Sequence, residues 1–125
     1  MLNYISKRDR QLSQRITWRL CAMIKDLTDE NFEEETKSGV TLTDFWAEWC
    51  GPCKMQTPVI EQMAEESDGS VEYSKVDIDE NPETPRQFGI MSIPTLLIKK
   101  DGEVVDTLIG YHSQEQIEET LSQYV

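Results

Sequence analysis

The strongest constraint on the fold is a β-prone run that leads directly into a pair of cysteines and then into a helical pattern. The run, residues 40–46, is nearly continuous, as is typical of a strand covered on both faces. Cys50 and Cys53 follow it, and beyond them apolar residues recur at helical spacing. The two thiols are therefore predicted to lie where a buried strand ends and a helix begins.

Two cysteines three positions apart in a first helical turn are close enough to form a bond reversibly. Side chains at positions i and i+3 lie about 5–6 Å apart at Cβ, and a disulfide requires about 3.5–4.5 Å. Only the thiolate attacks a disulfide, and the partial positive charge at a helix N-terminus stabilises that form. We expect Cys50, nearer the strand end, to be the nucleophile and the less exposed Cys53 to be the resolving thiol.

The composition indicates one domain in a reducing compartment. A chain of 125 residues with 38% hydrophobic content is long enough for a single core. Three cysteines are too few for a disulfide scaffold, which favours a reactive pair plus an incidental Cys21 in a cytoplasmic protein. The net charge of −12 argues against nucleic-acid binding by the main domain. No apolar run has the length that a membrane span needs.

Residues 1–22 differ from the rest of the chain. They hold five Lys or Arg residues and a single acid, and apolar residues recur among them at fourfold spacing, which would line one face of a helix. One interpretation is a targeting or docking arm. The other is a weakly ordered extension that reflects the choice of start site, since Met23 stands where the domain is predicted to begin. We expect residues 23–125 to form the domain, and residues 22–125 to fold and react without the rest of the extension.

Capping and spacing signals in the first half of that domain predict two strand–helix units. The first is a short strand at residues 23–27 and a helix with Thr28 as its N-cap, ending near Gly39. The second consists of the strand and the helix on either side of the cysteines. Pro58 lies inside that helix, where the loss of a backbone hydrogen bond predicts a kink.

The second half of the domain is predicted to end in a hairpin and a helix. We expect a strand at residues 71–78 and then a short helix that has Asn81 as its N-cap and Pro82 as its first residue and that stops at Gly89. A hairpin at residues 95–108 follows, and then a helix that begins with a capping box of Ser113 and Gln116. Alternating β and α units favour parallel pairing, whereas the hairpin must be antiparallel. The predicted fold class is therefore α/β, with a mixed sheet and the order βαβαβαββα.

At this point the chain closely resembles the thioredoxin family. The resemblance covers about residues 23–125 and rests on five features: the run Phe-Trp-Ala-Glu-Trp-Cys-Gly-Pro-Cys-Lys at residues 45–54, Asp44 before it, Lys75, Ile93-Pro94-Thr95, and Gly110. A bare pair of cysteines at this spacing also begins many zinc sites, but the decapeptide together with the later Ile-Pro-Thr is highly specific. The resemblance implies a thioredoxin fold with a five-stranded central sheet flanked by four helices.

Asp44 is a candidate proton acceptor. It occupies an alternating strand position among apolar neighbours, so burial is expected to raise the pKa of its carboxyl group. The resemblance implies that this carboxylate takes the proton of Cys53, with Lys75 beside it. The alternatives are a solvated aspartate at a strand end and a buried pair that only adds rigidity.

The resemblance also implies a substrate-contact surface. Pro94 is expected to follow a cis peptide bond, to present the Ile93 backbone to an extended substrate strand, and to keep metal ions from the two thiols. The residues that match the family's apolar contact surface are Trp49, Gly51, Pro52, Ile78, Ile93 and Gly110. Tyr111 departs from the family, which usually has a smaller residue there, and His112 is interpreted as an incidental loop residue.

The function expected from these features is protein disulfide reduction by a thiol-disulfide oxidoreductase. The resemblance implies a monomer without a bound cofactor, with electrons that come from NADPH through a thioredoxin reductase and pass to disulfide-containing proteins. A non-catalytic binding module that uses the same surface is the alternative. A zinc site is disfavoured, because about four ligands are needed and Cys21 and His112 stand at no paired spacing with the two reactive cysteines.

Overall fold

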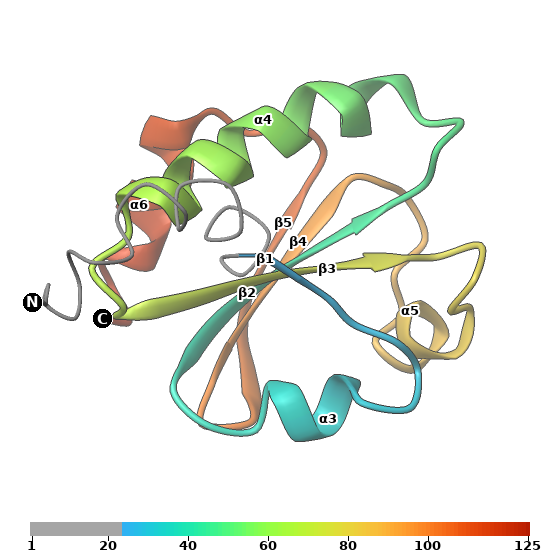
Figure 1. Ribbon diagram of the computed structural model, residues 1–125, viewed down its shortest axis with the longest axis horizontal. Helices are drawn as coiled ribbons and strands as arrows, with labels where there is room; N and C mark the ends of the chain where they lie inside the picture. Colours follow the sequence, from blue (N-terminus) through green and yellow to red (C-terminus); the bar gives the residue numbers. More distant parts are fainter. Residues whose placement is uncertain (1–23) are drawn as a thin grey trace, which may run out of the picture.

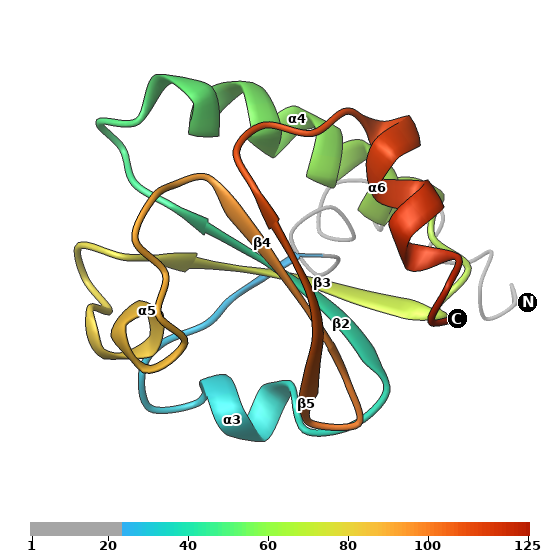
Figure 2. The same cartoon turned by 180° about the vertical axis from the view of Figure 1, so that it is seen from behind.

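The computed structural model describes residues 24–125, which form a five-stranded sheet with helices on both faces (Figures 1 and 2). The elements are, in chain order, β1 (Ile24–Asp26), α3 (Phe32–Glu35), β2 (Val40–Trp46), α4 (Gly51–Glu66), β3 (Val71–Asp77), α5 (Glu83–Gln87), β4 (Thr95–Lys100), β5 (Glu103–Ile109) and α6 (Gln114–Leu121). This order of strands and helices confirms the one predicted from the sequence. The predictions for residues 1–22, for Cys21 and for Met23 lie outside the described residues.

The sheet has the strand order β1-β3-β2-β4-β5, which places β2 at its centre. Strands β1, β3 and β2 pair in parallel, and β4 pairs antiparallel with both β2 and β5. The mixed sheet is therefore confirmed. Helices α4 and α6 cover one face, and α3 and α5 cover the other (Figures 1 and 2). None of the helices in the described part of the chain is long and apolar enough to cross a membrane.

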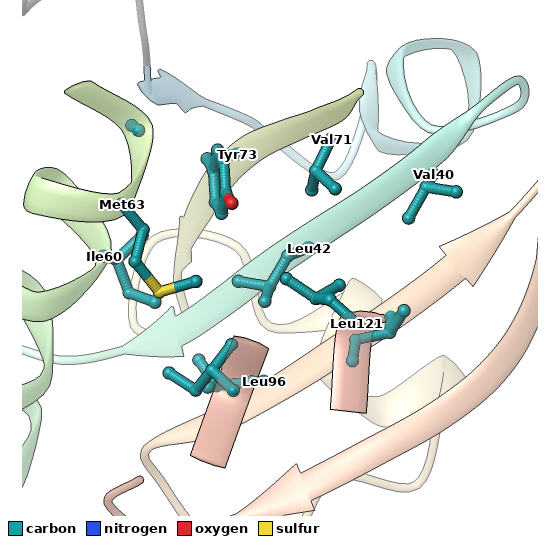
Figure 3. Packing of buried hydrophobic residues seen from close by; sticks show 11 residues of the cluster. Val40, Leu42, Ile60, Met63, Val71, Tyr73, Leu96 and Leu121 are labelled. Atoms are coloured by element: carbon teal, nitrogen blue, oxygen red, sulfur yellow. The ribbon is translucent and has the colours of Figure 1, made fainter. Parts of the chain in front are cut away.

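Each face of the sheet packs on its own apolar core. The larger core lies between the sheet and helices α4 and α6, where Leu42 and Leu96 of the sheet meet Ile60 and Met63 of α4 and Leu121 of α6 (Figure 3). The smaller core on the opposite face contains Leu27, Phe32, Phe45, Val76 and Leu97. Strand β2 supplies residues to both cores, which explains why its sequence is nearly continuous in β-prone residues instead of alternating with polar ones.

Helix α3 is shorter than predicted. It begins at Phe32 with Asn31 as its N-cap, so the prediction that Thr28 is the N-cap is wrong. Thr28 instead begins a turn, in which its backbone N–H donates to Asn31 Oδ1 over 2.8 Å and its carbonyl accepts from the Phe32 N–H over 3.0 Å. The helix ends at Glu35, and its C-cap Thr36 donates to the Phe32 carbonyl through both its backbone N–H, over 3.1 Å, and its hydroxyl, over 2.8 Å.

Helix α5 also begins later than predicted, at Glu83, with Pro82 in the N-cap position. The cap comes from a residue distant in sequence. Asp29 Oδ1 accepts hydrogen bonds from the Thr84 backbone N–H at 2.8 Å and from its hydroxyl at 2.6 Å, and Oδ2 accepts from the Glu83 N–H at 3.2 Å. Asn81, the predicted N-cap, accepts from the Asp29 N–H at 3.0 Å and so positions the residue that caps the helix.

The later elements agree with the sequence. Gly89 has a φ of +67°, a backbone conformation that glycine adopts readily, and it follows α5 as the predicted stop. The hairpin of β4 and β5 and the capping box of Ser113 and Gln116 are confirmed. Helix α4 continues through Pro58 as a single element, and the kink there remains a prediction.

We predict that Asp29→Ala lowers the free energy of unfolding by about 1–2 kcal/mol, because α5 loses the acceptor for its first N–H groups. Burial raises the pKa of Asp29, but hydrogen bonds from Thr84 and Glu83 outweigh it and hold that pKa below its ordinary value of 3.8. The stabilisation is therefore full at neutral pH and is lost as the pH falls through the folded-state pKa. Urea unfolding at pH 7 and pH 3 measures both effects. Glu30→Ala, at an exposed neighbour, is the control, and equal effects of the two substitutions would contradict the capping role.

A second stability prediction concerns Lys99, whose side chain is buried in the smaller core between Phe32 and Phe88. Its ammonium group donates to Thr36 Oγ1 over 2.9 Å and lies 3.8 Å from the exposed Glu33 carboxylate. Replacement of a buried ion pair by apolar side chains of similar volume is often stabilising, whereas removal of one partner is costly when it leaves the other charge buried. Here the partner carboxylate of Glu33 is exposed, so it stays solvated when Lys99 is replaced. Because Thr36 keeps its bond to the Phe32 carbonyl, Lys99→Met should raise the free energy of unfolding by about 1 kcal/mol. Chemical unfolding tests this against Lys100→Met at an exposed position, and a large loss of stability specific to Lys99→Met would refute it.

Candidate functional site

The two cysteines form a disulfide at the N-terminus of α4, with their Cα atoms 5.3 Å apart. Cys50 is the N-cap of the helix, and its Sγ accepts a hydrogen bond from the Cys53 backbone N–H over 3.2 Å. Gly51 and Pro52 form the start of the helix, where a proline costs no intrahelical hydrogen bond. The predicted strand–disulfide–helix junction is confirmed.

Both cysteine residues are buried, and the small difference in exposure between them has the predicted direction. Cys50 is 5% exposed and Cys53 is 1% exposed. They pack with Ala47 in a small apolar cluster that Trp46, Ile78 and Ile93 border. A partner disulfide can therefore reach Cys50 more readily than Cys53.

The segment that contains Pro94 lies directly beside Cys50. The Ile93-Pro94 peptide bond is cis, as the resemblance implied. Cys50 Sγ lies 3.8 Å from the Ile93 carbonyl oxygen, so the thiol of the reduced state can donate to that oxygen. The Pro94 carbonyl accepts from the Gly110 N–H at 2.8 Å, which ties the loop after β5 to the same segment.

Asp44 lies two positions before the end of β2 and is buried. Burial raises the pKa of its carboxyl group to about 7, and the positive charge of Lys75 opposes this effect. Its Oδ1 has no hydrogen-bond partner among the described residues. The prediction of a desolvated carboxyl group with a raised pKa is thus confirmed, and such a group can exchange a proton near neutral pH.

Lys75 lies opposite Asp44 in the register of β2 and β3, but its ion pair is with another residue. Lys75 Nζ is 3.8 Å from Asp26 Oδ1 and 5.4 Å from the centroid of the Trp46 ring. Asp26, Lys75 and Asp44 occupy one row across three parallel strands, with opposite charges at neighbouring positions. The sequence analysis missed Asp26, because the pairing of β1 with β3 cannot be inferred from local patterns.

A pocket of about 270 Å³ adjoins the disulfide region, and it contains three of the predicted contact residues. Its lining residues are Trp49, Ile78, Pro85, Ile90, Met91, Ser92 and Ile93. Met91 is 95% exposed and the Trp49 side chain is held by a 2.9 Å hydrogen bond from its indole N–H to Asp79 Oδ2. The sequence analysis missed Pro85, Ile90 and Met91, although their proximity to Ile93 in the sequence was a usable signal.

The remaining predicted contact residues do not line this pocket. Gly51 and Pro52 are exposed at the start of α4, and Gly110 begins the loop between β5 and α6. Within residues 24–125, no group of three or more His, Cys, Asp or Glu side chains is arranged to hold a metal ion.

Comparison with known proteins agrees with the geometry of the site. The family model described as thioredoxin matches residues 23–123. A protein named thioredoxin from Listeria monocytogenes is 58% identical over 103 residues, which cover 82% of this chain and 100% of the relative. A thioredoxin from Staphylococcus haemolyticus is 50% identical over 104 residues, which cover 83% of this chain and 99% of the relative. A thioredoxin from Bacillus subtilis is 49% identical over 98 residues, which cover 78% of this chain and 94% of the relative. With its disulfide at the N-terminus of α4, the chain belongs to the thioredoxin family and has the dithiol/disulfide oxidoreductase activity of that family.

Proposed function

We propose that the chain reduces disulfide bonds in other proteins, with Cys50 and Cys53 as its redox-active pair. The observation that carries this proposal is the Cys50–Cys53 disulfide itself, at a helix N-terminus and with Cys50 as the more exposed of the two residues. The apolar pocket close by supplies a surface for an unfolded or extended substrate segment.

In the first step the Cys50 thiolate attacks one sulfur of the substrate disulfide. A new bond forms between Cys50 Sγ and that sulfur, while the other substrate sulfur leaves as a thiolate. The Cys53 N–H, which donates to Cys50 Sγ over 3.2 Å, and the partial positive charge at the N-terminus of α4 stabilise the attacking thiolate.

In the second step Cys53 attacks Cys50 Sγ in the mixed disulfide. The intramolecular disulfide forms, and the first substrate sulfur leaves as a thiolate, so that two electrons have passed to the substrate. Cys53 must lose its proton before it attacks, and Asp44 is the proposed acceptor. A base with a pKa of about 7 is far better matched to a thiol than an aspartate of ordinary pKa 3.8.

The proposed contact surface consists of Trp49, Gly51, Pro52, Ile78, Ile93, Pro94 and Gly110. The backbone of Ile93 would pair with an extended substrate strand next to Cys50, whose Sγ lies 3.8 Å from the Ile93 carbonyl. Pro94, without an N–H and with a bulky ring, would keep metal ions from the two thiols. Lys75 would moderate the raised pKa of Asp44.

The proposal extends to the source of electrons and the setting. We propose that the chain acts as a monomer in the cytoplasm, binds no cofactor of its own, and receives electrons from NADPH through a thioredoxin reductase. Three cysteines in 125 residues suit a compartment that keeps thiols reduced. We also propose residues 23–125 as the functional domain. No observation on the described residues favours a non-catalytic binding module.

Cysteine variants test the order of the two thiols. In insulin reduction driven by dithiothreitol, or by NADPH with a thioredoxin reductase, Cys50→Ser should abolish activity. Cys53→Ser should still carry out the first step, the attack of Cys50 on the substrate disulfide. It should then accumulate a mixed disulfide with the substrate, because the resolving thiol is missing. Mass spectrometry detects the trapped adduct, and each variant's circular dichroism serves as the control for folding. An inactive but folded wild-type chain in both assays, or an adduct on Cys50→Ser instead, would overturn the proposal.

Asp44→Asn tests the proton acceptor. Because the variant cannot accept a proton, resolution of the mixed disulfide at pH 7 should slow by at least about tenfold. The inflection near pH 7 in the rate profile should disappear, since it reflects the titration of Asp44. Rapid-mixing kinetics of insulin reduction between pH 5 and 9 measure both effects, with Glu61→Gln on the exposed side of α4 as control. An unchanged pH profile would rule out this role.

The same variant checks the raised pKa independently of catalysis. The native state holds the Asp44 proton up to about pH 7, whereas the unfolded state releases it near the ordinary pKa of 3.8. Wild-type stability should therefore decline as the pH rises from about 4 to about 7. Asp44→Asn should not show this decline and should be more stable than wild type at pH 8 by about 4 kcal/mol.

A further inference from the structure

One buried amide side chain connects the helix of the cysteines to the loop between β5 and α6. Gln56 is 0% exposed, and both the oxygen and the nitrogen of its amide group form hydrogen bonds with the backbone of a single residue, His112. Gln56 Oε1 accepts from the His112 N–H at 2.8 Å, and Gln56 Nε2 donates to the His112 carbonyl at 3.0 Å. The side chain thus pairs with the loop as a neighbouring strand would.

Gln56 differs from the other buried residues of α4 in carrying a strongly polar group. The other buried side chains of α4 are Cys53, Ile60, Met63 and Ala64, which are apolar or weakly polar. Burial of an amide costs free energy unless its groups are hydrogen-bonded, so the core gives no reason for a glutamine at this position. The reason lies in the loop, whose backbone N–H and carbonyl would otherwise need other partners.

The loop in turn contacts the redox site. His112 Nδ1 lies 2.9 Å from the Gly110 carbonyl, so this nitrogen carries the proton and donates to it. The Gly110 N–H donates to the Pro94 carbonyl at 2.8 Å, and the Ile93 carbonyl is 3.8 Å from Cys50 Sγ. The contacts therefore form a closed ring that leads from α4 through the loop and the cis-proline segment back to Cys50.

The first turns of α4 belong to that ring as well. Cys50, Cys53 and Gln56 follow one another at intervals of three residues, which places them along one side of the helix. All three are buried. A shift of the loop relative to α4 would therefore change the position of Gly110 and of the exposed Tyr111 relative to Cys50, without moving the disulfide itself.

We propose that Gln56 is a positioning residue for recognition of protein substrates, because it fixes the loop of residues 110–112 beside the cysteine pair. This inference rests on the proposed function. A protein disulfide must fit the surface around Cys50, including Gly110 and Tyr111, whereas a small disulfide needs to reach only the sulfur. Gln56 accordingly governs the preference for protein over small disulfides and leaves the reactivity of Cys50 unchanged.

The test compares two substrates with one pre-reduced enzyme. For Gln56→Met, which keeps the length of the side chain and loses both hydrogen bonds, the second-order rate constant with insulin should fall about three- to tenfold. The rate constant with a small aromatic disulfide should stay within the error of the wild-type value. Gln62→Met makes the same replacement at an exposed position of α4 and should change neither rate constant.

A double-mutant cycle with Tyr111→Ala tests whether Gln56 affects the insulin rate through the loop of residues 110–112. If Gln56 acts by holding the loop, Gln56→Met should have a smaller effect on the insulin rate in the Tyr111→Ala background than in the wild type. Near-UV circular dichroism and the small-disulfide rate confirm that each variant is folded. The inference is overturned if insulin and the small disulfide slow equally, or if neither slows. Failure of the wild-type chain to reduce insulin would instead refute the proposed function.

Discussion

The burial of strand β2 is the constraint on which the rest of the structure depends. It pairs with β3 on one side and β4 on the other, so its backbone groups are paired along its length, and its side chains fill both cores. Such a strand can end only where the sheet ends. The chain that leaves Trp46 must therefore turn at the carboxyl ends of the parallel strands, and α4 begins there with Cys50 as its N-cap. The position of the disulfide follows from the position of the strand.

The same burial determines the electrostatics of the site. Asp44 is in β2 and faces the larger core, so its carboxyl group lacks the solvent that would stabilise its charge, and burial raises its pKa. Lys75 is its neighbour in the register, but Asp26 forms the ion pair with that lysine. The positive charge of Lys75 opposes the effect of burial, but burial is the larger effect, and the pKa of Asp44 is left at about 7.

The sequence predicts those parts of the fold and site that depend on residues close together in the chain. The capping box of Ser113 and Gln116, the hairpin turn and the cysteine pair are all local, and each is confirmed. The predicted start of α3 was wrong because Thr28 and Asn31 form a local turn in place of the first helical turn. The predicted start of α5 was wrong because the contact that caps this helix is not local. Asp29, which caps α5, lies 55 positions before Thr84, and no local signal reveals that contact. Asp26 beside Lys75 and Gln56 beside His112 escaped the sequence analysis for the same reason.

The number of partners that a buried polar group has differs among three side chains, Lys99, Gln56 and Asp44. Lys99 has a hydroxyl, a carboxylate and two aromatic rings around its ammonium group, and both ends of the Gln56 amide are hydrogen-bonded. A satisfied group holds its partners in place and resists change, because any movement would leave it unpaired in the core. Asp44 has a buried oxygen with no such partner among residues 24–125. That carboxyl group can therefore gain or lose a proton without breaking a hydrogen bond of this oxygen, as its proposed role of proton acceptor requires.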